Sequence, residues 1–337
     1  MKRTLLALAL VSPALLNAQL RIAQSSPVAS ERSAAAPIDD TPAIVGRWDI
    51  TITGSEQPMP SWLEVVPSGN GYLVGRFVGV VGSARPISRI EYTNGVMHFA
   101  IPPQWEQGTG DLMVEGRLQG EGLTGSMTLP DGQQLSWSAK RAPSLRRTAA
   151  PKWGPWVKLL SNNSISGWHT LGDNQWQVVS GVLRSPRSGS NIVTDSTFTD
   201  YQLHIEFRYP KGSNSGVYQR GRYEVQIEDS VTADTQDDLL GAVYGFISPS
   251  DVMAKQAGMW QSFDITLLGR SITVVANGKM VICNREIPGI TGGALDSNEG
   301  EPGPLLLQGD HGPIEYRNIR IRRALATRGA PVAPTKR

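Results

Sequence analysis

The sequence predicts an all-β protein in which a small antiparallel β-barrel or sandwich precedes a larger sandwich of two stacked sheets. Many of its 36 Gly and 23 Pro residues fall between short apolar runs, as is typical of strands joined by turns. Asn94-Gly95 and Asp131-Gly132 are favoured sequences for tight hairpin turns. Helical periodicity is almost lacking, so the longer C-terminal series of strands is expected to stack as two sheets.

The N-terminal segment predicts export. Lys2 and Arg3 precede an apolar stretch, residues 4–16, that is too short to span a bilayer, and a cleavage after Ala18 fits this pattern. No Cys follows the apolar stretch and no later run reaches the length of a membrane span, so we expect a periplasmic or secreted protein without a membrane anchor.

The composition of the chain after the leader indicates two β domains separated by linkers. Segments rich in Pro, Ala, Ser or basic residues separate two β-rich regions and predict linkers. The expected parts are a signal peptide (1–18), a flexible linker (19–42), a small β domain (43–140), a second linker (141–155), a larger sandwich domain (156–324) and a tail (325–337).

Alternating or continuous apolar runs locate the expected strands. In the first domain they cover residues 48–52, 72–77, 95–99, 112–118, 123–127 and 135–137. In the second domain they cover residues 176–179, 201–209, 216–220, 223–227, 263–268, 271–276, 304–307 and 314–321. Cys283, the only cysteine, lies in a further apolar run and is expected to be a small core residue.

Charge narrows the class of partner. The chain has 32 Lys and Arg against 30 Asp and Glu, and removal of the leader with Lys2 and Arg3 leaves the two counts equal. A neutral chain without a basic stripe argues against binding to nucleic acid or to an anionic membrane surface. The expected partner is a small molecule with little charge.

One strand concentrates polar groups on a single face. Since side chains alternate along a strand, Tyr223, Val225 and Ile227 should face the core, whereas Glu224 and Gln226, followed by Glu228, should form a row on the other face. Such a row could line a sugar-binding concavity. The alternative is a sheet face that meets water, as antiparallel sheets often have.

A histidine at the end of another strand adds a second polar group. His311 lies in the loop Gly309-Asp310-His311-Gly312, directly after an apolar run. Loops at strand ends place reactive groups on a rigid scaffold, and imidazole transfers protons near neutral pH. The alternative is a histidine in an ordinary surface turn.

Eight short segments along residues 156–324 form a characteristic series. The segments are SGW (166–168), WQVVSGVL (176–183), DYQLHIEFR (200–208), NSGVY (214–218), YEVQIED (223–229), GAVYG (241–245), NG (277–278) and LQGDHGPIEYRNI (307–319). With this set the second domain resembles the 3-keto-disaccharide hydrolase family, which implies a concanavalin-like jelly roll. Where the family is commonly apolar, this chain has Glu228.

The resemblance implies a small carbohydrate substrate, a glycoside whose 3-hydroxyl is oxidised to a ketone. The ketone acidifies the proton on C2, so a base can remove it, the group on C1 can leave, and water can add afterwards. The implied catalytic residues are Glu224, Gln226 and His311, with Glu224 or His311 as the base.

The resemblance also implies binding residues. Arg220 would polarise the ketone or hold hydroxyl groups, and Gln308, Asn214 and Tyr218 would make secondary contacts. A divalent metal ion held by Glu224 and His311 is an alternative stabiliser of the enolate, although the sequence lacks a tight metal-binding spacing.

Two other functions remain open. An ordinary retaining glycoside hydrolase would use Glu224 with Glu228, but these positions lie about 13 Å apart at Cα on a straight strand, whereas retaining pairs need carboxyl groups roughly 5 Å apart. A non-catalytic carbohydrate-binding module would use the nine tryptophans, Trp260 foremost, as stacking surfaces.

The first domain carries little chemistry of its own. Its opening Gly46-Arg47-Trp48 resembles small up-and-down barrels of the lipocalin kind. We expect a packing or accessory-binding role for this domain.

Overall fold

The computed structural model describes residues 42–325 except 55, 104–107, 162 and 231–235, and these residues belong to one compact unit, Thr41–Arg337. The predicted signal peptide, the linker up to residue 41 and the tail from residue 326 lie outside the described residues. All regular elements of the described part are strands. It contains no helix that is long and apolar enough to cross a membrane.

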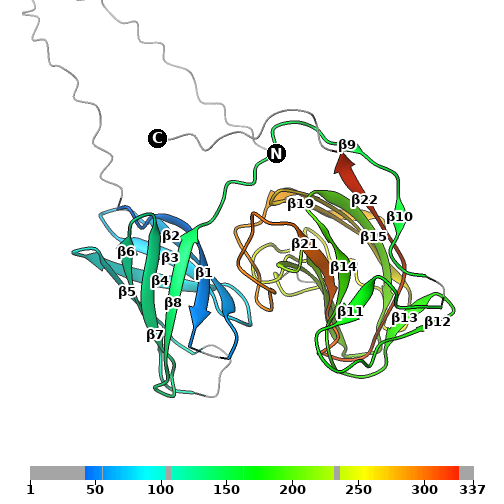
Figure 1. Cartoon of the computed structure of the whole chain (residues 1–337), viewed down its shortest axis with the longest axis horizontal. Helices are drawn as coiled ribbons and strands as arrows, with labels where there is room; N and C mark the ends of the chain where they lie inside the picture. The colour runs from blue at the N-terminus through cyan, green and yellow to red at the C-terminus, as the bar shows by residue number, and fades with distance from the viewer. Residues whose placement is uncertain (1–41, 55, 104–107, 162, 231–235, 326–337) are drawn as a thin grey trace, which may run out of the picture. The chain divides into compact units, whose positions relative to one another are not determined.

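The first eight strands form a closed barrel in which each strand pairs antiparallel with the next and the last pairs with the first (Figure 1). They are β1 (Gly46–Thr53), β2 (Met59–Pro67), β3 (Leu73–Val78), β4 (Arg85–Thr93), β5 (Val96–Ile101), β6 (Leu112–Gln119), β7 (Gly122–Thr128) and β8 (Gln134–Arg141). Alternate apolar residues such as Trp48, Ile50 and Leu63 fill the interior.

Two barrel strands, β2 and β4, are absent from the sequence prediction. In β2 three consecutive residues, Ser61, Trp62 and Leu63, are all buried. Both faces of the strand therefore carry apolar residues, and the sequence shows no polar–apolar alternation there. Leu63 belongs to the barrel core, whereas Trp62 points outward into the core of the second domain. Burial on both faces removes the period of two on which the prediction depends.

The second domain is a sandwich of two antiparallel sheets (Figure 1). The larger sheet has the order β12 (Gln177–Val179), β13 (Val182–Ser185), β22 (Ile314–Leu325), β15 (Tyr201–Arg208), β18 (Gln261–Leu268), β19 (Ser271–Ala276) and β20 (Lys279–Glu286), and β9 (Lys152–Trp153) and β10 (Val157–Lys158) also pair with β22. The smaller sheet has the order β11 (Trp168–Thr170), β14 (Ile192–Phe198), β21 (Gly303–Leu307), β16 (Asn214–Gln219) and β17 (Tyr223–Glu228).

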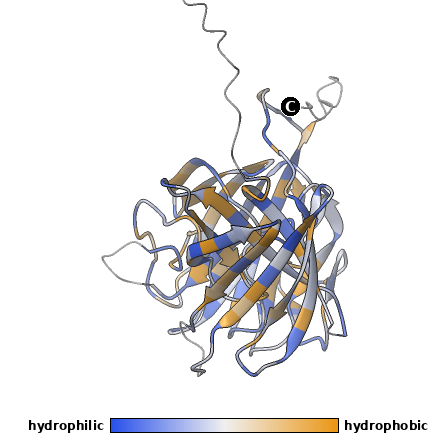
Figure 2. Ribbon diagram, turned by 90° about the vertical axis from the view of Figure 1, so that its left-hand side faces the viewer, coloured by the Kyte–Doolittle hydropathy of each residue, from blue (hydrophilic) through white to orange (hydrophobic). Residues whose placement is uncertain are grey.

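The facing sides of the two sheets make the main hydrophobic core. Strand β15 alternates fully buried Leu203, Ile205 and Phe207 with partly exposed residues. Figure 2, in which the barrel faces the viewer, shows the same kind of change between hydrophobic and hydrophilic residues along the barrel strands. The predicted all-β fold, a small antiparallel barrel or sandwich followed by a larger two-sheet sandwich, is confirmed, and the first domain is the barrel.

The prediction for Cys283 is wrong, because this side chain is exposed. Strand β20 is irregular in its pairing with β19, and Val281 and Ile282 are both buried there. Two consecutive inward residues shift the following alternation, so Cys283 faces outward.

The outer face of β1 to β3 packs on the sandwich domain. Asp49, Trp62 and Val78 lie side by side across the three strands and are all buried. The Trp62 ring meets Phe246 edge to face at a centroid distance of 5.4 Å. A Cβ atom added to Gly289 would lie 2.2 Å from the Trp62 ring, so only glycine permits this close approach.

A buried polar network borders Trp62. Glu299 is fully buried and accepts hydrogen bonds from Arg270 and from the Tyr223 hydroxyl, the latter at 2.8 Å. Burial and the nearby negative charge of Glu299 raise the pKa of Asp49 to about 9. Asp49 is therefore protonated at neutral pH in the folded protein.

We predict that the Asp49→Asn substitution stabilises the protein above pH 4, and increasingly so up to about pH 9. Between its ordinary pKa of 3.8 and about 9, Asp49 stays protonated in the folded chain but ionises in the unfolded chain, so this residue costs more stability as pH rises. Thermal unfolding at pH 4, 6.5 and 8.5 measures the difference, expected to exceed about 1 kcal/mol at pH 8.5. A constant difference across this range would contradict the assignment.

Candidate functional site

The candidate site lies on the face of the smaller sheet that is turned away from the main core. Strands β16 and β17 pair Tyr218 with Glu224 and Gly216 with Gln226, so these residues share one face. The neighbouring residues Val217, Val225 and Ile227 face the main core. The alternation expected from the sequence thus brings Glu224 and Gln226 to the same side.

A cavity of about 150 Å³ opens on this face. It is lined by Val81, Gly82, Asn191, Asn214, Tyr218, Glu224, Gln226, Tyr244, Gly292, Gly293, Gln308, Asp310 and His311. The structure therefore brings together six of the eight site residues expected from the sequence.

Glu224 occupies the floor of the cavity and is only 3% exposed. A Cβ atom on Gly216 would lie 2.0 Å from Glu224 Oε1, so the carboxyl group lies directly over the backbone of β16. Glycine at position 216 creates the space in which this carboxyl group is buried.

Tyr218 is the immediate partner of the Glu224 carboxyl group. Its hydroxyl lies 2.8 Å from Glu224 Oε2 and 3.0 Å from the carbonyl oxygen of Gly292. When Glu224 is ionised, Tyr218 donates to it; when Glu224 is protonated, the carboxyl O–H can donate to Tyr218, which then donates to Gly292. Both protonation states of Glu224 thus have a satisfied hydrogen bond.

Burial raises the pKa of Glu224 to about 8. The Tyr218 hydrogen bond and the positive charge of His311 act in the opposite direction, and the charge of Asp310 adds to the rise. A carboxyl group with a pKa near 8 is a much stronger base, once ionised, than an ordinary glutamate.

His311 reaches the same cavity from the loop after β21. Its Nδ1 lies 2.7 Å from Asp310 Oδ1, and the ring is half-exposed. This hydrogen bond, the Asp310 charge and the Glu224 charge raise the pKa of His311, while burial opposes them. The imidazole is therefore biased toward its cationic form, beside a carboxyl group that burial biases toward its neutral form.

Two amide side chains supply free hydrogen-bonding capacity. Gln226 and Gln308 line the cavity, are 3% and 8% exposed, and have side-chain oxygens without a hydrogen-bond partner among the described residues. A buried acceptor without a partner is costly unless a ligand or water satisfies it. Neutral hydroxyl groups of a ligand would do so. Asn214, at the start of β16, adds a further amide to the cavity.

Arg220 lies elsewhere, against the expectation that it contacts the substrate. It has a positive φ of 54° in the β16–β17 turn and is 1% exposed. Its guanidinium donates to the Tyr223 hydroxyl at 2.9 Å and to the carbonyl oxygens of Gly269 and Glu299. The turn directs Arg220 into the buried polar network of Glu299, so its role there is structural.

Trp260 and Glu228 also lie outside the cavity lining. The Trp260 ring lies beside the guanidinium groups of Arg208 and Arg317, at 4.8 and 3.9 Å from the ring centroid, in contact with the larger sheet. Glu228 follows Gln226 on the same face but pairs with Asn214 at the far end of β17.

Sequence reasoning assigned no role to Asn191, Tyr244, Asp310, Val81 or Gly82, which also line the cavity. Asp310 is next to His311 in the chain, so its pairing with the imidazole could have been anticipated. Asn191 and Tyr244 come from loops, and Val81 and Gly82 come from the barrel. No pattern within the sequence links such distant segments.

The structure adds no third acidic, histidine or cysteine ligand to Glu224 and His311 among the described residues. Within the described ranges, no group of three or more His, Cys, Asp or Glu side chains is arranged to hold a metal ion. The pairing of Glu224 with His311 around a metal stays a prediction.

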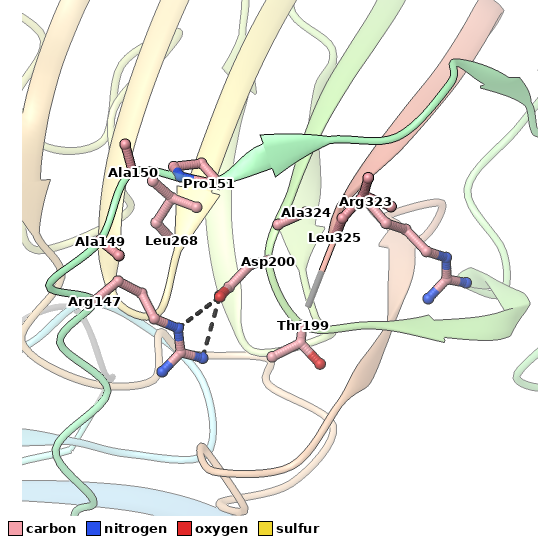
Figure 3. A pocket seen from close by; sticks show the side chains of 10 residues that line it. All are labelled: Arg147, Ala149, Ala150, Pro151, Thr199, Asp200, Leu268, Arg323, Ala324 and Leu325. Carbon is pink, nitrogen blue, oxygen red and sulfur yellow. Dashed lines mark hydrogen bonds and ion pairs between the residues drawn. The ribbon is translucent and has the colours of Figure 1, made fainter. Parts of the chain in front are cut away.

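A larger cavity of about 350 Å³ lies beside residues 147–151 and the end of β22 (Figure 3). Its one carboxylate, Asp200, accepts hydrogen bonds from Arg147 at 2.6 Å and from the Gly269 amide at 2.7 Å. Arg323 is turned away and donates to the Thr197 carbonyl oxygen at 2.7 Å. With its charged groups paired, this cavity offers no acid or base for catalysis.

One family model matches the second half of the chain. Residues 155–322 match a family described as the 3-keto-alpha-glucoside-1,2-lyase-like domain. No curated protein matches the chain.

Among the solved structures that are similar to this chain, three each match about half of it. Two are each described as a "putative glycosyl hydrolase" from Parabacteroides distasonis: one is 27% identical and covers 50% of this chain and 84% of that chain with a TM-score of 0.42, and the other is 25% identical and covers 51% and 100% with a TM-score of 0.40. The third is the carbohydrate-binding module CBM66 from Bacillus subtilis, 11% identical, covering 49% and 98% with a TM-score of 0.34.

We predict that the Tyr218→Phe substitution raises the pKa of Glu224 above about 8. The lost hydrogen bond favours the ionised form, so its removal makes the carboxyl group harder to ionise. Carbon-13 NMR titration of labelled glutamate side chains measures this value. Tyr72→Phe, at an exposed barrel tyrosine, is the control. A lower or unchanged pKa in Tyr218→Phe would count against the geometry.

We also predict that Gly216→Ala disrupts the floor of the cavity. The added methyl group would lie 2.0 Å from Glu224 Oε1, closer than two such atoms can approach, so the carboxyl group must move. Thermal unfolding should show a loss of about 1–3 kcal/mol. Gly108→Ala, where the nearest atom would be 3.8 Å away, should be close to neutral.

Proposed function

We propose that the domain at residues 155–322, which matches the 3-keto-alpha-glucoside-1,2-lyase-like domain family, cleaves glycosides whose C3 hydroxyl has been oxidised to a ketone. The family match supports a carbohydrate-active domain. The observation that carries it is the burial of Glu224, with a pKa of about 8, in one cavity with His311 and two unpaired amide oxygens.

Glu224 is the proposed general base. The C2 proton of a 3-keto sugar is acidified by the neighbouring ketone, and a base with a pKa near the working pH is best suited to remove it. Burial gives Glu224 that basicity, and the Tyr218 hydroxyl holds the carboxylate in place. The cationic bias of His311 makes it a poorer base and a better partner for negative charge.

His311 is the proposed stabiliser of the enolate. When the C2 proton moves to Glu224, negative charge develops on the ketone oxygen. A preorganised cation in a partly water-excluded site lowers the energy of that charge. Asp310 fixes the imidazole through Nδ1, which leaves Nε2 as the ring nitrogen that can face the substrate.

The enolate then eliminates the group on C1. The enolate re-forms the ketone as its electrons move to make a C1–C2 double bond, and the C1–O bond breaks with the electron pair leaving on the departing oxygen. That oxygen takes a proton from the protonated Glu224 or from water. Addition of water across C1–C2 in a later step gives net hydrolysis.

Gln226, Gln308 and Asn214 are the proposed contacts to sugar hydroxyl groups. The unpaired oxygens of Gln226 and Gln308 can accept hydrogen bonds from sugar hydroxyl groups. The amide groups carry no charge, which suits the neutral hydroxyl groups of a sugar.

The ordinary retaining hydrolase is less consistent with the cavity, because its second carboxylate, Glu228, does not line it. Asp310 does line it, but its Oδ1 is bonded to His311. A purely binding role remains the alternative, since the same amides would hold a sugar without catalysis.

Incubation with a 3-keto-glucoside and with its unoxidised parent tests the reaction. We expect release of the leaving group from the ketone alone, because only the ketone acidifies the C2 proton. Deuterium at C2 should slow the release. Cleavage of the parent would favour the ordinary hydrolase, and cleavage of neither would favour a binding module.

Glu224→Gln is predicted to lower kcat by about 10²–10⁴-fold through loss of the base, and His311→Asn by about 10²-fold or more through loss of enolate stabilisation. Glu91→Gln and His169→Asn are the controls. Glu91 is an exposed glutamate of the barrel outside the cavity lining. His169 has a similar Asp195 partner at 2.6 Å on the surface.

The wild-type pH profile should show kcat/KM rising with pH up to about 8, because Glu224 must lose its proton before it can act. His311 must keep its proton to stabilise the enolate, so its deprotonation should lower kcat/KM, and the hydrogen bond to Asp310, which raises the pKa of His311, shifts this loss to higher pH. A flat profile between pH 6 and 8 would argue against Glu224 as the base.

Export to the periplasm or the exterior remains part of the proposal, from the leader at residues 1–18. Mass spectrometry of the protein made in a bacterial host with its leader should give an N-terminus close to Gln19. An intact Met1 in the extracytoplasmic fraction would contradict this.

A further inference from the structure

The N-terminal barrel contributes to the wall of the cavity. The loop between β3 and β4, residues 79–84, places Val81 and Gly82 among the lining residues. These positions lie outside residues 155–322, the part of the chain that the domain family covers.

This loop is held firmly on the sandwich. The Gly293 amide donates to the Val80 carbonyl oxygen at 2.8 Å. A Cβ atom on Gly292 would lie 2.3 Å from the Gly82 carbonyl oxygen, and one on Gly245 would lie 2.7 Å from Ser83 Cα. Glycines on both sandwich segments thus let the barrel backbone come into direct contact.

The loop lies at the Glu224 end of the cavity. Gly292, whose carbonyl oxygen receives the Tyr218 hydroxyl at 3.0 Å, is next to the residue that binds Val80. Tyr218 in turn contacts Glu224. Since the proposed base acts at C2, this end of the cavity is also where the neighbouring C1 and its leaving group must lie.

Val81 is chemically different from the rest of the lining. It is 57% exposed although it is a branched apolar residue, and most of the other lining side chains are polar. An exposed apolar side chain at the rim can gain from covering by an apolar group of a ligand. It offers no hydrogen bond to a second sugar.

We propose that the barrel loop forms the leaving-group subsite of this enzyme, in which Val81 contacts the leaving group on C1 and favours an apolar one. The inference rests on the proposed function for its reaction, but it assigns to the barrel a role in specificity. The sugar ring is held by the amides of the sandwich, and the leaving group extends past Val81.

The test compares two 3-keto-glucosides that differ only in the leaving group, phenyl or methyl. Val81→Asp should lower kcat/KM for the phenyl compound by about tenfold, mostly through KM, and change the methyl compound by less than twofold. Val66→Asp, at an exposed barrel valine away from the cavity, should change neither. An equal effect of Val81→Asp on both compounds would overturn the inference.

Binding separates this inference from the reaction itself. Calorimetry with the unoxidised phenyl and methyl glucosides measures affinity without turnover. Val81→Asp should weaken the binding of phenyl glucoside and leave that of methyl glucoside unchanged. Val81→Leu, which keeps an apolar side chain, should bind phenyl glucoside as the wild-type protein does. If the wild-type protein cleaves neither ketone, the proposed function fails, whereas the phenyl-selective loss of binding still supports the subsite. Unchanged phenyl binding in Val81→Asp would refute it.

Discussion

The burial of one carboxyl group, that of Glu224, is the constraint on which the site depends. Its position requires a strand whose neighbour lacks a side chain, and Gly216 meets that requirement. Water is excluded on that side by the β16 backbone, and the Tyr218 hydroxyl replaces it as a hydrogen-bonding partner. An isolated buried carboxylate would be strongly disfavoured, so the partner and the raised pKa are two consequences of the same burial.

The two faces of the smaller sheet have different roles around this group. The inner faces hold the hydrophobic core, with residues such as Val217 and Val225, and give β16 and β17 a fixed position. The opposite face of the smaller sheet then presents polar groups from adjacent strands at cross-strand spacing. Rigid strands hold Glu224 and Gln226, and a strand-end loop brings His311.

The barrel takes part in this arrangement through its outer face. Strands β1 to β3 carry buried Asp49, Trp62 and Val78 there, where an isolated barrel would present polar groups to water. Trp62 packs against Phe246, close in sequence to the cavity residue Tyr244. Packing of the barrel on the sandwich therefore helps to hold the loop that carries Tyr244 in position. Loss of this packing would be expected to change the shape of the cavity as well as the stability of the protein.

By itself the sequence determined the β architecture and the common face of Glu224 and Gln226, because both follow from the period of two along a strand, which is a local property. The order of motifs also pointed to His311 and Gln308. Only the tertiary structure decided that Arg220 turns into a buried network and that Trp260 contacts arginines of the larger sheet. It also decided that β2 is buried on both faces and that Val81 borders the cavity. These features depend on contacts between segments far apart in the chain, and such contacts leave no periodic signal in a single sequence.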